Sequence, residues 1–117
     1  MPSPYRVTIT GLAASNPWNP DYLKQAPFAI GVGCVVNSTT VTYNVEHSFD
    51  PIFAPIYGSS VGTIASSAAT WFQNSGITAQ STNKDGNYAF LVTAIRLNVT
   101  AGSATGTVTM SLIQAGI

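Results

Sequence analysis

The chain has 117 residues, and only 7% of them are charged, with four basic and four acidic side chains that balance to zero. An average soluble domain is about 25% charged, so this surface must be rich in hydroxyl and amide groups and is poorly suited to nucleic acid. No apolar run reaches the roughly 20 residues that cross a membrane as a helix, and we expect one domain over residues 1–117.

A single cysteine, Cys34, excludes an internal disulfide bond. Its place in the apolar run FAIGVGCVV predicts a small buried side chain rather than a reactive thiol. The first residues, MPSPYRVT, lack a basic segment followed by an apolar one. We therefore expect no secretion signal and synthesis in a cytoplasm.

Alternation of apolar and polar residues predicts a first strand over Tyr5–Thr10. Residues 12–27 contain three prolines, too many for a helix or a central strand, and we expect an ordered loop that its aromatic side chains hold in place. Residues 28–36 alternate again, and the face with Gly31 and Gly33 is nearly free of side chains. Another backbone can therefore approach this face closely.

Residues 40–48 form the next alternating segment. One face of it carries Val41, Tyr43, Val45 and His47. The turn sequence Asn37-Ser38 precedes it, which predicts a hairpin over residues 28–48.

The middle of the chain is less regular, because Pro51 and Pro55 exclude a continuous strand over residues 49–69. We expect a loop there with an apolar cluster of Phe49, Ile52, Phe53, Ile56 and Tyr57. Residues 61–64 suit either a flexible loop or a short edge strand.

A short strand is predicted at residues 70–73 and a weak one at residues 77–82. Residues 83–86, Asn-Lys-Asp-Gly, have the signal of a hairpin turn that leads into residues 88–99. The predicted inward set in that segment changes phase, from Tyr88, Phe90 and Val92 to Ile95, Leu97 and Val99. A bulge near Thr93-Ala94 would explain the change.

The strongest pattern spans residues 87–114, with a glycine-rich AGSATG turn between two alternating segments. It predicts an antiparallel pair with one buried face. That face holds Ile95, Leu97, Val99, Val108, Met110 and Leu112. The other face holds Arg96, Asn98, Thr100, Thr107, Thr109 and Ser111, and we expect a neighbouring subunit to cover it.

Together these segments predict six to eight strands and no helix. The fold class is all-β, an antiparallel β-sandwich or a small barrel of jelly-roll type with long loops.

Catalytic chemistry finds little support in this chain. His47 is the only histidine, and strand alternation points it away from its neighbour Glu46. A serine nucleophile would need that one imidazole as its base, and no G-x-S-x-G sequence is present. With one histidine, one cysteine and four scattered acids, we expect no metal site, no cofactor and no enzymatic activity.

Five aromatic residues that we expect to be exposed are the candidate interface: Trp18, Tyr22, Phe53, Tyr57 and Trp71. Aromatic side chains are enriched at the centres of protein interfaces. The same rings would suit a sugar-binding surface, or they would cap the open ends of the core.

The segments YRVTITGL, PFAIGVGCVVNSTTVTYNVEHSFD, ATWFQNSG and NYAFLVTAIRLNVT followed by GTVTMSLIQAG give the chain a resemblance to a family. It resembles the small virion proteins of tailed bacteriophages, of the head-associated, decoration or cement type. The resemblance implies a protein on the capsid exterior, assembled in the host cytoplasm, with the major capsid protein as its partner. It also implies a homo-oligomer, often a trimer, that clamps capsid subunits, and it brings no catalytic residue.

The leading hypothesis is therefore a capsid decoration or cement protein. The alternative is a carbohydrate-binding module of a phage head or tail fibre that acts through Trp18, Tyr22 or Trp71. An enzyme ranks last.

Overall fold

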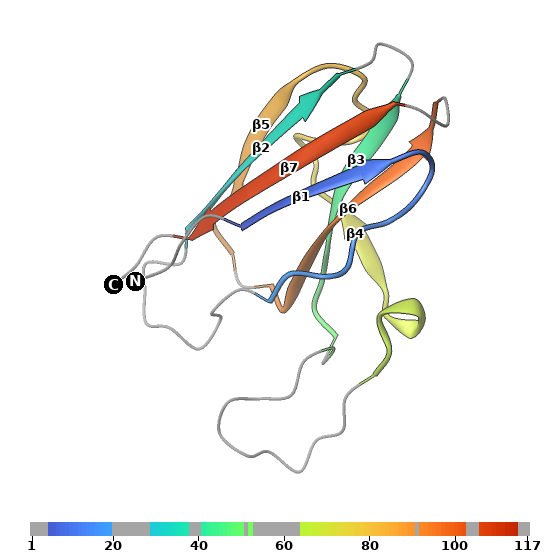
Figure 1. The fold of residues 1–117 in the computed structure, drawn as a ribbon. Coiled ribbons are helices and arrows are strands. Elements are labelled where there is room, and N and C mark those ends of the chain that lie inside the picture. The colour runs from blue at the N-terminus through green and yellow to red at the C-terminus, as the bar shows by residue number, and fades with distance from the viewer. Residues whose placement is uncertain are drawn as a thin grey trace.

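The computed structural model describes residues 5–19, 29–37, 41–50, 52, 64–90, 92–102 and 106–114. In these ranges the chain forms seven β-strands and a single turn of 3-10 helix, η1 (Ser66–Ala68). The strands make two antiparallel sheets that face each other as a sandwich (Figure 1). The predicted all-β class is confirmed. No helix of the described residues could span a membrane.

Four strands form sheet A, in the order β1, β7, β2, β5. Their bounds are β1 (Tyr5–Thr10), β7 (Thr107–Gln114), β2 (Ile30–Val36) and β5 (Lys84–Tyr88). Three strands form sheet B, in the order β4, β3, β6. Their bounds are β4 (Trp71–Gln73), β3 (Thr42–Ser48) and β6 (Ala94–Ala101).

The core lies between the sheets and consists of the apolar faces that alternation predicts. Its largest fully buried side chains include Tyr43, Tyr88, Ile30, Ile95, Leu97, Met110 and Leu112. Cys34 is also buried in this core, as the sequence predicts. Both faces of β3 are buried from Tyr43 onward, including the polar side chains of Asn44, Glu46 and Ser48 on its outer side.

The strand pair predicted over residues 87–114 is wrong in its partners. β6 pairs with β3, whereas β7 pairs with β1 and β2. The two strands bury the predicted residues, but they face each other across the core instead of lying side by side. Period-2 alternation shows which face of a strand is buried, but it does not show which other strand pairs with it.

The polar face predicted for the same segment is therefore two surfaces. Arg96, Asn98 and Thr100 lie on the outer side of sheet B, whereas Thr107, Thr109 and Ser111 lie on the outer side of sheet A. A single neighbouring subunit cannot cover both sides as one continuous face.

The hairpin predicted over residues 28–48 is also wrong, since β2 belongs to sheet A and β3 to sheet B. Asn37 extends the ladder with β7 instead of turning the chain. Its N–H donates to the Thr107 carbonyl oxygen at 3.2 Å, and its Oδ1 accepts from the Thr107 N–H at 2.8 Å. Asparagine is also a common turn residue, so an asparagine whose side chain accepts a hydrogen bond from a strand backbone cannot be told from a turn by sequence alone. Its partner in the predicted turn, Ser38, lies outside the described residues.

The Asp-Gly turn predicted at residues 83–86 falls in strand β5, where Gly86 pairs with Val32 of β2. A Cβ atom at Gly86 would lie 3.2 Å from Ile77 Cδ1, so the glycine permits close packing instead of a turn. Residues 77–82 form no strand, only a bridge between Gln80 and Tyr43.

The bulge predicted near residues 93–94 is wrong, because the phase change marks the crossing from β5 in sheet A to β6 in sheet B. Tyr88 and Val92 are buried on either side of this crossing, but Phe90 between them is 49% exposed. The inward position predicted for Phe90 is therefore wrong.

Part of the loop predicted over residues 12–27 pairs with the outer edge of β6. The Ser15 N–H donates to the Leu97 carbonyl oxygen at 2.7 Å, and the Leu97 N–H donates to Ser15 Oγ at 2.9 Å. Trp18 then stacks on Tyr5 of β1, with ring centroids 6.0 Å apart. This contact joins the edges of the two sheets and agrees with a loop that aromatic side chains hold.

Candidate functional site

Three phenylalanines lie at one end of the sandwich, around the end of β3. They are Phe72 of β4, Phe49 just after β3, and Phe90 just after β5. We call Phe49, Phe72 and Phe90 the phenylalanine cluster. The β3–β4 register pairs His47 with Phe72, so that the two side chains lie on the same face of sheet B.

The ring of Phe49 contacts those of Phe72 and Phe90, and all three rings contact the imidazole of His47. The Phe49 centroid lies 5.7 Å from that of Phe72 and 6.2 Å from that of Phe90. The His47 centroid lies 5.5, 6.0 and 5.3 Å from those of Phe49, Phe72 and Phe90. These separations are typical of attractive aromatic pairs.

The phenylalanine cluster is also exposed. Phe49, Phe72 and Phe90 are 52%, 48% and 49% accessible to solvent, although they belong to the most apolar residue types. Single exposed apolar side chains are common on proteins, but contiguous apolar patches mark interaction surfaces. Three half-exposed rings that are joined through Phe49 and His47 form such a patch.

His47 and Tyr88 lie on the buried side of the phenylalanine cluster. A hydrogen bond of 3.0 Å joins His47 Nδ1 to Tyr88 Oη, and their ring centroids are 5.0 Å apart. Burial lowers the pKa of His47 below its ordinary value and raises the pKa of Tyr88. Both rings are consequently uncharged at neutral pH.

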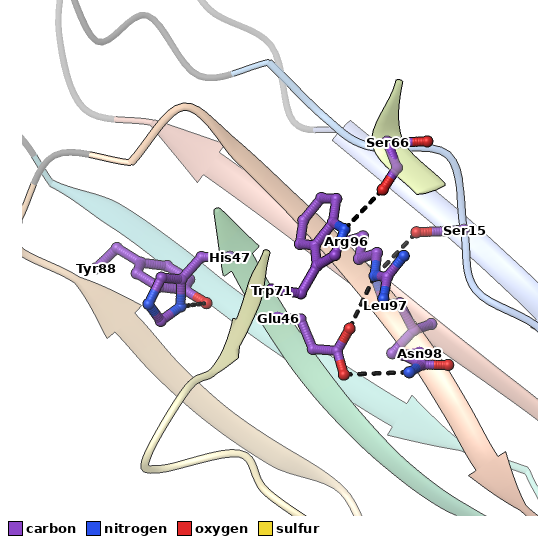
Figure 2. Close-up of polar contacts among 9 residues, drawn as sticks. All are labelled: Ser15, Glu46, His47, Ser66, Trp71, Tyr88, Arg96, Leu97 and Asn98. Atoms are coloured by element: carbon purple, nitrogen blue, oxygen red, sulfur yellow. Dashed lines mark hydrogen bonds and ion pairs between the residues drawn. The ribbon is translucent and has the colours of Figure 1, made fainter. Parts of the chain in front are cut away.

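A polar network occupies the opposite side of β3. Arg96 Nε donates to Glu46 Oε1 at 2.8 Å, and Asn98 Nδ2 donates to Glu46 Oε2 at 3.1 Å. The Arg96 guanidinium carbon lies 4.2 Å from the centroid of the Trp71 ring, whose Nε1 donates to the Ser66 carbonyl oxygen at 3.0 Å. Figure 2 shows this network and, apart from it, His47 with Tyr88.

Both carboxylate oxygens of Glu46 and the Nε of Arg96 have partners within the protein. The Glu46 carboxylate is therefore not directed toward an external ligand. Glu46 and His47 lie on opposite sides of β3, as alternation predicts, so they do not form a catalytic pair.

The remaining reactive groups give little scope for chemistry. Burial raises the pKa of the Cys34 thiol to about 12, which leaves almost no thiolate at neutral pH. Among the described residues no three His, Cys, Asp or Glu side chains come together as metal ligands.

The structure describes two of the five residues in the candidate interface predicted from sequence. Trp18 packs against the core beside Tyr5, whereas Trp71 lies on the outer side of sheet B with the Arg96 guanidinium over its ring. Trp18 bridges Ile95 at the β6 edge of sheet B, whereas Trp71 belongs to β4 at the other edge of that sheet. The other three predicted residues, Tyr22, Phe53 and Tyr57, lie outside the described residues.

Sequence reasoning did not place Phe72 or Phe90 in the candidate interface. One signal was available for Phe72: in the short strand TWFQ, alternation puts Phe72 on the face opposite Trp71. No comparable signal exists for Phe90, which the local pattern groups with the buried Tyr88 and Val92.

Comparison with known proteins identifies no relative of this chain. No protein-family model, no curated protein and no solved structure matches the chain. Inference about its function therefore begins from the phenylalanine cluster and the scarcity of charge.

Proposed function

We propose that this protein is a structural virion protein, a decoration or cement protein that binds the outer surface of a phage head and stabilises it. The phenylalanine cluster carries this proposal, because it is an apolar patch on a protein with few charges. Its partner is the major capsid protein, and burial of the three rings against capsid subunits supplies the adhesion.

The size of the phenylalanine cluster bears on how the protein binds. A phenylalanine buries roughly 200 Å² when fully covered, so three half-exposed rings offer roughly 300 Å² more. At about 25 cal/mol per Å² this area contributes roughly 7 kcal/mol. Association costs about 4–15 kcal/mol in lost freedom, so one copy of the cluster binds weakly.

Several linked copies would bind far more tightly than one, because each later contact forms at high effective concentration. This arithmetic supports a homo-oligomer, and we propose the trimer that the family resemblance implies. It also suits a capsid, where subunits repeat and every copy finds an equivalent site, and we propose the exterior location that the family resemblance implies.

Cosedimentation with expanded capsid shells of the encoding phage tests this proposal. We expect the wild-type protein to bind at both low and high salt, because few charges take part. Phe72→Ser should reduce the bound fraction. Val35→Ser is the matched control, since Val35 is 57% exposed on the outer side of sheet A, away from the cluster.

Two results would contradict the proposal. One is a purified wild-type protein that does not bind expanded capsids. The other is a virion that lacks the protein and survives heating as well as the complete virion does.

Carbohydrate binding by a phage head or tail fibre is the competing proposal. The half-buried ring of Trp71 supports it, since aromatic rings stack on sugars, although the Arg96 guanidinium already lies over this ring. Glycan-array binding that Trp71→Ala abolishes, with capsid binding absent, would favour this function over the first.

A further inference from the structure

We propose that His47 makes the phenylalanine cluster acid-sensitive: the neutral imidazole packs the three rings into an adhesive surface, and protonation of His47 disrupts that packing. This inference rests on the proposed function, because it concerns regulation of the same surface. Its first experiment uses the protein alone, so that the two proposals fail separately.

The position of His47 is the first support. Its imidazole contacts Phe49, Phe72 and Phe90, with centroid separations of 5.3 to 6.0 Å, and it is only 7% exposed. An imidazolium needs water or an acceptor for its second N–H. Water can solvate the ring only if the surrounding phenylalanines separate.

The charges around His47 are the second support. From β5 it meets Tyr88, whose phenol stays neutral, and from β4 it meets Phe72, which does not titrate. The core thiol of Cys34 on β2 is also neutral. Among the described residues no salt bridge to His47 is formed.

The two nearest acids in sequence are already occupied elsewhere. Glu46 lies on the other side of β3, where Arg96 of β6 neutralises it. Asp50 Oδ2 accepts a hydrogen bond from the Thr70 N–H at 2.6 Å. Among the described residues no carboxylate therefore forms an ion pair with His47, and burial lowers the pKa of this histidine.

The sign of the effect follows from linkage. Because the pKa of His47 is lower in the folded state than in the unfolded state, the unfolded chain takes up the proton first. The contribution of neutral His47 to the free energy of unfolding is complete above the ordinary pKa of about 6.5. It is lost as the pH falls from there through the lowered pKa.

An NMR titration tests the inference without any variant, since His47 is the only histidine and its ring signals are unambiguous. We expect a midpoint below 6.5, with simultaneous shifts of the phenylalanine ring signals. A midpoint at or above the ordinary value, or a titration that leaves the phenylalanine signals unchanged, would overturn the inference.

His47→Gln provides the second arm, because glutamine can accept from Tyr88 Oη and does not titrate. Capsid cosedimentation of the wild-type protein should fall as the pH drops through the NMR midpoint. The bound fraction of His47→Gln, taken relative to its own value at neutral pH, should not change over the same range. Equal acid loss in both proteins would contradict regulation by His47. Absence of capsid binding at neutral pH would instead count against the proposed function, and the NMR result would still decide the acid response.

Discussion

His47 of β3 and Tyr88 of β5 join the two sheets through a hydrogen bond of 3.0 Å between Nδ1 and Oη. Both side chains are buried at the end of the core, directly behind Phe90. The exposed phenylalanine cluster therefore rests on a polar pair that fixes the spacing of the sheets at this end.

Tyr88→Phe removes the hydroxyl and leaves the buried His47 Nδ1 without its partner. We expect the free energy of unfolding to fall by about 1–3 kcal/mol, the usual cost of an unsatisfied buried group. Urea denaturation at pH 7.5 measures it. Tyr5→Phe is the control, since the Tyr5 hydroxyl bonds to none of the described residues, and an equal loss in both variants would argue against the pair.

Two glycines provide a matched test of core packing. Gly86→Ala places a methyl group 3.2 Å from Ile77 Cδ1 in the core, so we expect a loss of about 1–2 kcal/mol from overpacking. Gly33→Ala meets nothing within 4 Å and should be neutral or stabilising, by up to about 0.5–1 kcal/mol. Thermal unfolding of the two variants should shift in different directions, and a larger loss at Gly33 would refute the packing described at β5.

The ion pair between Glu46 and Arg96 should be strongly coupled. Arg96→Met leaves Glu46 buried with one remaining partner, Asn98, and we expect a loss of about 3 kcal/mol, near the lower end for a broken buried pair. Glu46→Gln with Arg96→Met should lose less than the sum of the single changes.

Urea denaturation of the four proteins in this cycle measures the coupling. Lys84→Met is the control for loss of an exposed charge, and it should change stability by less than about 0.5 kcal/mol. Additive losses for Glu46 and Arg96 would show that the pair is not coupled.

Cys34 should resist thiol reagents in the folded protein. Cys34 is 2% exposed, so a reagent cannot reach its sulfur. Burial also raises the pKa of its thiol to about 12, so little thiolate is present. We expect labelling by a disulfide reagent at pH 8 to proceed only through unfolding and to accelerate with urea. Immediate labelling without denaturant would contradict the buried position.

Local alternation predicted much of this fold. The spans of β1, β3 and β4 follow the predicted segments closely, and the inward residues of β2, β6 and β7 are buried as expected. The sequence could not show which strands pair. The buried faces of β2 and β3, and those of β6 and β7, would be the same if each pair formed a hairpin in one sheet. Asn37 and Gly86 are residue types common in turns, so they favoured hairpins where the structure has strand pairing.

The candidate site was less predictable than the fold. Tryptophans attract attention in a sequence, yet Trp18 packs against the core and Trp71 lies under Arg96. The phenylalanine cluster depends on where three separate segments end in space, which is a tertiary property. His47 is buried on the face that alternation predicts, where it bonds to Tyr88, but the ring cluster around it could not be derived from one strand.

A density map of the virion with this protein in place tests the central claim most directly. We predict the protein on the outer surface of the head, in symmetric groups, with the end that bears Phe49, Phe72 and Phe90 against the capsid shell. A map in which that end points to solvent, or in which no copy lies on the head, would contradict the account.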